Sequence, residues 1–160
     1  MLNEKELPFL AEKGHIVSLV GGGGKTTLLY AMAAHCARKG WRVLVMTTTH
    51  IRQPAACYAP DDAALTALWQ AGHYAVIGTP AENGKLTLPP QQLLRRMAQA
   101  DAVFIEADGA KHHPCKLPAA HDRIRSYRPC SCTFFLFKMR QHARYALLTQ
   151  KLLYLYALLA

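Results

Sequence analysis

The sequence predicts an α/β fold in which helices cover both faces of a parallel sheet. Three observations predict it: an apolar run at 16–20 that ends in glycines, a helical pattern followed by a second apolar run at 41–46, and a third apolar run at 102–105 that ends in acid. A strand, a helix and a second strand in this order form a right-handed crossover, so the strands are parallel. At 160 residues, one domain with its own core is expected. Ligands of such sheets bind beyond the carboxyl ends of the strands.

The glycine-rich stretch after the first strand has the chemistry of a phosphate-binding loop. Ile16–Val20 is rich in β-branched residues, and four glycines separate it from Lys25. Glycines let backbone N–H groups approach phosphate oxygens because no Cβ intervenes, and the following helix points the positive end of its dipole at the anion. In such loops the lysine reaches the β- and γ-phosphates, and the next hydroxyl, here Thr26, binds Mg²⁺. The residues expected to bind nucleotide are Gly21, Gly22, Gly23, Gly24, Lys25, Thr26 and Thr27.

This loop is shorter than the full P-loop pattern, G-x-x-x-x-G-K-[ST]. The full pattern needs a glycine five residues before Gly24, where this chain has Leu19. What remains is G-x-x-G-K-T-T from Gly21 to Thr27, and short loops of this kind resemble those of the Mur-ligase ATP sites. The alternative is a glycine-rich turn with an exposed lysine. The entropic cost of four consecutive glycines argues against that alternative.

The segment after the loop predicts a helix and then a second strand. Apolar residues recur at helical spacing over 26–38, and Gly40 suits the position just past a helix end. Trp41–Met46 is a short apolar strand, and Thr47 and Thr48 follow it at the expected ligand-binding edge. Their hydroxyls could bind phosphate or a metal-bound water. The alternative is that residues of high β-propensity simply end the strand.

Shorter elements are expected between this unit and the third strand. Their ends are indicated by local signals, namely capping residues, a stop at Gly72, a turn sequence at 82–85 and a proline pair. They are a loop at 52–60, a helix from Asp61 or Asp62 to Gln70, a small hairpin pairing Tyr74–Ile77 with Leu86–Leu88, and a helix from Pro89 or Pro90 through Ala98.

The third strand ends in carboxylates that could hold a metal ion. Asp101–Glu106 contains four consecutive apolar residues, and Asp108 follows two residues later. An apolar strand that ends in a carboxylate is the Walker-B arrangement, in which the carboxylate holds Mg²⁺ or its water. Such a strand is weak evidence alone, but a phosphate loop in the same chain strengthens it. Glu106 or Asp108 is therefore expected near the metal, with a plain turn as the alternative.

Two lysines beyond this edge are candidates for phosphate or substrate contacts. Lys111 and Lys116 follow the predicted carboxylates. A zinc site built from His112, His113 and Cys115 is disfavoured, because adjacent histidines rarely share one ion and the chain has no Cys-x-x-Cys pair.

Composition narrows the class of protein and its location. The formal net charge is +9, but residues 1–125 contribute only +4, and 126–160 contribute +5 with no acidic residue. No nucleic-acid-binding motif accompanies this excess, so a nucleic-acid partner is not expected. The N-terminus lacks the apolar core of a secretory signal, so a cytoplasmic location is expected, with the five cysteines as free thiols.

Several of these motifs together resemble the YqeC family. They are Gly22–Thr27, Thr47–Thr49 and Glu106–Lys111, with Pro114, Lys116, Pro118 and His121 beyond. The likeness covers about residues 8–124, and the stretch E-A-D-G-A-K-x-x-P-x-K is its most specific part. Members are described as selenium cofactor biosynthesis proteins, accessory to selenium-dependent molybdenum hydroxylases. The resemblance implies such a hydroxylase or its cofactor as partner, and roles for Lys25, Thr26, Thr47, Glu106, Asp108, Lys111 and Lys116.

The chain departs from the family pattern in places, most strongly near its end. Cys115 stands where a leucine-like residue is expected, and His112 and His113 replace smaller residues. The likeness stops near Arg125, which divides a nucleotide-binding domain at 1–125 from an aromatic, basic tail. For the tail at 126–160 we expect a frameshift or a truncated gene as the origin, which would leave the sheet incomplete at its C-terminus. The alternative is a basic amphipathic helix over 134–159, which its lysines and arginines prevent from spanning a membrane.

The sequence thus predicts a protein that binds ATP or GTP with Mg²⁺ and acts as a maturation factor in selenium cofactor or molybdenum hydroxylase biosynthesis. Lys25 would neutralise charge on the transferred phosphoryl group, while Thr26 with Glu106 or Asp108 would place the ion. Lys25, Asp108 and Lys111 are the candidate catalytic residues for ATP hydrolysis or for phosphoryl or ligase chemistry, and Thr48 or Asp108 the candidates for orienting water. The alternatives are a small-molecule kinase or ligase and a nucleotide-binding module that does not hydrolyse.

Overall fold

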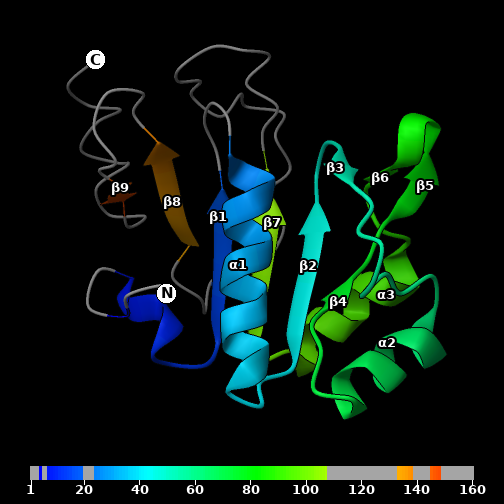
Figure 1. Ribbon diagram of the computed structural model, residues 1–160, viewed down its shortest axis with the longest axis horizontal. Helices are drawn as coiled ribbons and strands as arrows, with labels where there is room; N and C mark the ends of the chain where they lie inside the picture. Colours follow the sequence, from blue (N-terminus) through cyan, green and yellow to red (C-terminus); the bar gives the residue numbers. More distant parts are fainter. Residues whose placement is uncertain (1–3, 5–6, 20–23, 108–132, 139–144, 149–160) are drawn as a thin grey trace.

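The computed structural model describes residues 4, 7–19, 24–107, 133–138 and 145–148, the last two segments as backbone only. Its main sheet has six strands in the order β4-β2-β7-β1-β8-β9, of which the first five are parallel and β9 is antiparallel (Figure 1). The bounds are β1 His15–Leu19, β2 Val43–Thr47, β4 Ala75–Val76, β7 Ala102–Glu106, β8 Thr133–Lys138 and β9 Tyr145–Leu148.

The central strands are buried on both faces, which explains their unbroken apolar sequences. Successive side chains of a strand point to opposite faces. Val45 and Phe104 therefore pack in the cluster that contains the buried residues of α1 (Lys25–Arg38). Their neighbours Leu44 and Val103 pack with the buried leucines of α2 (Asp62–Gln70) and α3 (Gln91–Leu94). The predicted α/β fold, with a parallel sheet and helices on both faces, is thus confirmed.

Helix α1 links two strands that are not neighbours. It leaves the carboxyl end of β1 and returns to β2, while β7 lies between these two strands (Figure 1). The register sets Glu106 of β7 beside Leu19 of β1 on one side and Thr47 of β2 on the other. The carboxyl ends of β1, β7 and β2 therefore lie side by side at one edge of the sheet.

The predicted helix ends agree with the structure. Gly40 has φ +78° directly after α1 and its C-cap Lys39, and Gly72 has φ +73° after α2 and its C-cap Ala71. The left-handed region is costly for residues with a Cβ, so glycine suits both positions. Asp61 caps α2 by accepting a hydrogen bond from the Ala64 backbone N–H at 2.8 Å.

The hairpin expected in the middle of the chain forms with a different first strand. Ala75–Val76 is β4 and pairs with β2 in the main sheet, whereas β5 (Thr79–Ala81) pairs with β6 (Lys85–Thr87). The segment expected to be a loop from residue 52 instead opens with β3 (Ile51–Arg52), which pairs with the other edge of β6. Gly78, between β4 and β5, lets the chain pass close to β6, because a Cβ there would lie 2.7 Å from the Leu86 Cβ.

The helix expected after the proline pair is split. It begins as α3 at Gln91 and continues as a 3₁₀ helix, η3 (Arg95–Gln99); two others, η1 (Pro8–Leu10) and η2 (Glu82–Gly84), lie elsewhere. Among the described residues, Cys36 and Cys57 are free thiols, as expected.

The tail contains strands where the alternative hypothesis was a helix. β8 pairs in parallel with β1, and β9 pairs with β8. The segment Thr-Phe-Phe-Leu-Phe is typical of a strand that adds to a sheet edge, and this pairing outweighs the helical spacing of its apolar residues. The helix over 134–159 is therefore wrong for β8 and β9, while the frameshift hypothesis stays a prediction. No helix in the described part of the chain is long and apolar enough to cross a membrane.

Candidate functional site

The candidate site lies where α1 begins, at the carboxyl edge of the sheet. Gly24 is the N-cap of α1 and has φ +74°, a left-handed conformation that favours glycine. Lys25 and Thr26 form the first turn and are half-buried, whereas Thr27 is exposed. The first turn leaves backbone N–H groups without helical acceptors. This end of α1 is therefore suited to an anion, as the sequence predicted.

The structure brings the Thr26 hydroxyl and the Glu106 carboxylate together across 80 residues of sequence. Thr26 Oγ1 donates a hydrogen bond to Glu106 Oε2 at 2.7 Å. Glu106 is the last residue of β7 and is only 8% exposed. The two residues expected to place Mg²⁺ are thus neighbours. Both offer oxygen, which Mg²⁺ prefers, and a site with one carboxylate leaves room for waters and substrate phosphates. These residues fit the ion.

The environment of Glu106 opposes its negative charge. Burial raises the pKa of its carboxyl group above the ordinary value, while the hydrogen bond from Thr26 and the positive charge of Lys25 act in the opposite direction. A further positive charge at this position would favour the ionised carboxylate. Binding of a cation beside Glu106 stays a prediction.

The threonines that end β2 hold this edge of the sheet together. Thr47 is fully buried, and its hydroxyl donates to the Glu106 backbone oxygen at 2.9 Å and accepts from the Thr49 N–H at 3.0 Å. The Thr48 hydroxyl donates to the Ala107 backbone oxygen at 3.0 Å. In the described structure these hydroxyls join β2 to β7, and their direct contact with nucleotide stays a prediction.

Tyr30 belongs to this site, although the sequence analysis did not single it out. It lies four residues after Thr26, on the same face of α1, and its hydroxyl donates to the Arg52 backbone oxygen at 2.6 Å. Its ring stacks on Tyr74 with 6.0 Å between centroids. Burial raises its pKa, and Tyr74 and Glu106 raise it further, so the hydroxyl stays a neutral donor. The spacing from Thr26 was the only sequence signal for it.

Several residues predicted for the site lie outside the described residues. They are Gly21, Gly22, Gly23, Asp108, Lys111 and Lys116. Of the two carboxylates considered for the metal, Glu106 is within the described residues and lies beside Thr26, so the choice between it and Asp108 stays a prediction. Over the described ranges, no three His, Cys, Asp or Glu residues gather in a way that could hold a metal ion, and the disfavoured zinc residues are outside those ranges.

The fold and this edge define the class: an α/β protein with a parallel sheet, whose first helix and third central strand bring a hydroxyl and a carboxylate together. Within that class the chain belongs to the YqeC family, since residues 17–125 match the family described as YqeC protein. It is 32% identical over 116 residues to the protein of Escherichia coli (strain K12) named uncharacterized protein YqeC. That match covers 67% of this chain and 45% of the relative.

These comparisons confirm the resemblance that the sequence motifs indicated. The family match ends at residue 125, where the sequence changes character. No solved structure matches the chain.

Proposed function

We propose that this protein binds a nucleoside triphosphate, ATP or GTP, together with Mg²⁺ at the carboxyl edge of its sheet. The observation that carries the proposal is the 2.7 Å contact between Thr26 Oγ1 and Glu106 Oε2, beside the beginning of α1. A hydroxyl just after a glycine loop and a carboxylate at the end of a neighbouring strand are the protein ligands that nucleotide-bound Mg²⁺ needs. The placement of β7 next to β1 supports the proposal, because it sets Glu106 beside the end of the strand that leads into the loop.

Each residue of the site would have a distinct part in binding. Backbone N–H groups from the loop to Lys25 would bind the phosphates, and the Lys25 ammonium would offset their charge. Thr26 and Glu106 would hold Mg²⁺, which supplies a positive charge that draws electron density from the terminal phosphate. Thr47 and Thr48 would keep Glu106 in place through their bonds to the backbone of β7 and the residue after it.

The biological role that we propose is maturation of a selenium cofactor or of a selenium-dependent molybdenum hydroxylase. The family resemblance supports this role, and hydrolysis of the nucleotide would supply its driving force. Deleting the gene should lower the activity of the hydroxylase at unchanged protein level, and an allele carrying Lys25→Ala should not restore it. Restoration by that allele would contradict a role that depends on nucleotide.

Thermal unfolding with and without Mg·ATP or Mg·GTP tests the binding proposal. A ligand at 100 times its Kd stabilises the folded state by about 2.7 kcal/mol, which corresponds to a rise in Tm of about 5 to 10 °C for a chain of this size. Lys25→Ala should abolish the rise. Arg38→Ala removes a charge at the opposite end of α1 and should leave the rise intact. An equal rise in the Lys25→Ala protein would refute the phosphate loop.

A further inference from the structure

A small antiparallel sheet lies beside the candidate site and carries two cations. Strands β3, β6 and β5 form it, and β3 begins four residues after β2 ends, next to the carboxyl end of β2 (Figure 1). Ile51 of β3 and Leu86 of β6 are a directly opposed pair and are both buried. The next pair along, Arg52 and Lys85, is exposed. This sheet therefore has an apolar side on the core and a cationic side facing solvent.

Arg52 and Lys85 carry like charges and lie directly opposite each other in the β3–β6 ladder. The Gln53 N–H donates to the Gly84 backbone oxygen at 2.9 Å, which makes Arg52 and Lys85 a non-hydrogen-bonded pair of the ladder. Side chains in such pairs are closer than in hydrogen-bonded pairs, and like charges directly opposite each other are destabilising. The arrangement therefore costs stability unless an anion lies between the two groups.

No acidic side chain offsets these two charges in the described part of the chain. The ion pairs there involve other cations, namely Lys13, His35, Lys39, Arg42 and Arg96. Glu82 is close in sequence and exposed, but forms no ion pair with either cation. Among the described residues the pair is thus a surface with unbalanced positive charge.

Tyr30 ties this cationic pair to the nucleotide site. Its hydroxyl bonds to the Arg52 backbone, and its position on α1 is one turn from Thr26. The tether fixes β3 relative to the helix that begins at the proposed phosphate loop. The Arg52–Lys85 pair is therefore connected to the helix of the candidate nucleotide site through one hydrogen bond to the Arg52 backbone.

We propose that Arg52 and Lys85 bind the oxyanion group, carboxylate or phosphate, of a small second substrate that is used together with the nucleotide. Arginine binds such groups through two parallel hydrogen bonds, and lysine adds a point charge. This inference rests on the proposed function, because only nucleotide binding at the neighbouring site would make the bound anion a second substrate. It names the substrate class as a small acid.

The test measures Tm in inorganic phosphate and in succinate, against chloride at equal ionic strength. It uses the full chain with Lys25→Ala, which removes phosphate binding at the loop, alone and combined with Arg52→Gln or Lys85→Gln. At least one of the two anions should raise Tm in the Lys25→Ala protein, and either second substitution should abolish that rise. The anion that acts identifies the group as phosphate or carboxylate.

A second signature separates a binding pair from ordinary surface charges. In chloride alone, Arg52→Gln and Lys85→Gln should each raise Tm by about 1 to 3 °C, because repulsion is relieved. Arg38→Gln, the matched control, should leave the anion-dependent rise unchanged. Protection by neither anion, or equal protection in the Arg52→Gln protein, would overturn the inference.

The same measurements distinguish failure of the second-substrate site from failure of the proposed nucleotide binding. If Mg·ATP and Mg·GTP leave the Tm of the unmodified chain unchanged while the anion effect still depends on Arg52 and Lys85, the nucleotide proposal fails and an anion site remains. If nucleotide stabilises the chain but the anion effect is absent, only the second-substrate site is refuted.

Discussion

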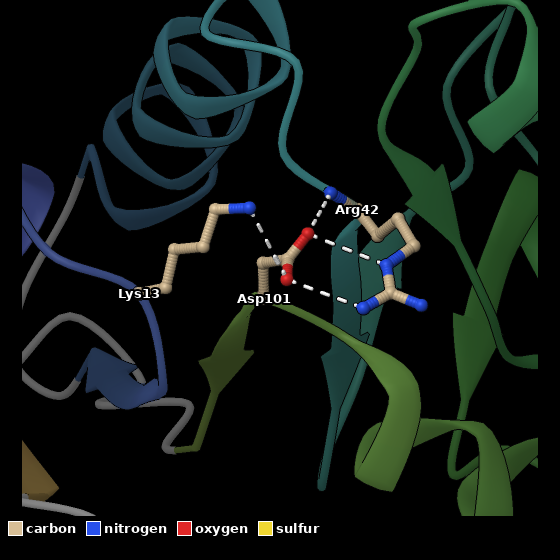
Figure 2. A network of polar contacts seen from close by, with 3 residues as sticks. All are labelled: Lys13, Arg42 and Asp101. Carbon is tan, nitrogen blue, oxygen red and sulfur yellow. Dashed lines mark hydrogen bonds and ion pairs between the residues drawn. The ribbon is translucent and has the colours of Figure 1, made fainter.

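The two ends of strand β7 shift the pKa of an acidic side chain in opposite directions: it is lowered at the amino end and raised at the carboxyl end. At the amino end, the Asp101 carboxylate accepts hydrogen bonds from the backbone N–H of Arg42 at 2.8 Å and from Arg42 Nε and Nη2, each at 3.3 Å (Figure 2). Lys13 Nζ lies 3.5 Å from the same carboxylate. Burial by itself would raise the pKa of Asp101, but these bonds and charges outweigh it and hold the pKa below the ordinary value.

At the carboxyl end the acidic side chain is that of Glu106, and its pKa is shifted in the other direction. Its side chain accepts a hydrogen bond from Thr26 and lies near Lys25, and burial keeps its pKa above the ordinary value. Asp101 is therefore a completed structural junction between the beginnings of β2 and β7. Glu106 is a buried carboxylate with a raised pKa, a combination that is common at ligand-binding sites.

The largest effect on stability should come from removing the completed junction. Asp101→Ala removes the acceptor for Arg42 and Lys13 and should lower the free energy of unfolding by about 2 to 4 kcal/mol. Chemical denaturation at neutral pH measures this loss. The stabilisation gained from Mg·ATP should be unchanged, because Asp101 lies at the other end of β7. A large loss of nucleotide binding would show that the two ends are not independent.

Lowering the pH should reproduce part of the loss in free energy of unfolding that Asp101→Ala causes. Because the pKa of Asp101 is lower in the folded chain, its charge stabilises the fold above the unfolded pKa of about 3.9. The contribution is lost as pH falls through the lower, folded value. Comparing unfolding of the unmodified and Asp101→Asn proteins over pH 2 to 6 should show a difference that shrinks as pH falls. A constant difference would contradict the ion-pair explanation.

In the absence of nucleotide, Glu106→Gln should raise the free energy of unfolding, whereas Asp101→Ala lowers it. Glutamine keeps an acceptor for Thr26 but removes the charge that burial disfavours, so the free energy of unfolding at neutral pH should rise by up to about 1 kcal/mol. The effect of Mg²⁺ on ATP-dependent stabilisation should then be lost, which comparison of ATP with and without Mg²⁺ measures. Full retention of the Mg²⁺ effect would assign the metal to another carboxylate, with Asp108→Asn as the next variant.

Thr48→Val should have a similarly small effect on stability, and the smallest effect on nucleotide binding. It removes one hydrogen bond to the Ala107 backbone oxygen and should cost about 1 kcal/mol in the free energy of unfolding. If Thr48 only joins β2 to the residue after β7, the Tm rise with Mg·ATP should match that of the unmodified chain. A smaller rise would indicate that its hydroxyl also contacts nucleotide.

The strongest local patterns predicted most of the core and part of the site. The strands β1, β2 and β7 were predicted because each is an unbroken apolar run, and the helices α1 and α2 because each is bounded by capping or stop residues. Glu106 and Thr26 were predicted because a strand-end acid and a residue after a glycine loop are recognisable without knowledge of what they touch.

Short strands were predicted poorly because their pairing partners are distant in sequence. β4 was expected as a strand but with the wrong partner, since it pairs with β2 and not with the segment at 86–88. β3 was expected to be loop, because its two residues are too few for a pattern. The tail shows the same limit, since the free edge of β1 made a strand of the apolar run beginning at Thr133.

The sequence by itself therefore determined the α/β class, the likeness to the YqeC family and the residue types at the carboxyl edge. These features depend on local propensity and on motif spacing. The tertiary structure alone decided that β7 lies between β1 and β2, that Thr26 meets Glu106, and that Tyr30 holds β3 so that Arg52 faces solvent beside Lys85. Such contacts join residues 22 to 80 positions apart, and only the packing of helices on both faces of the sheet brings them within hydrogen-bond distance.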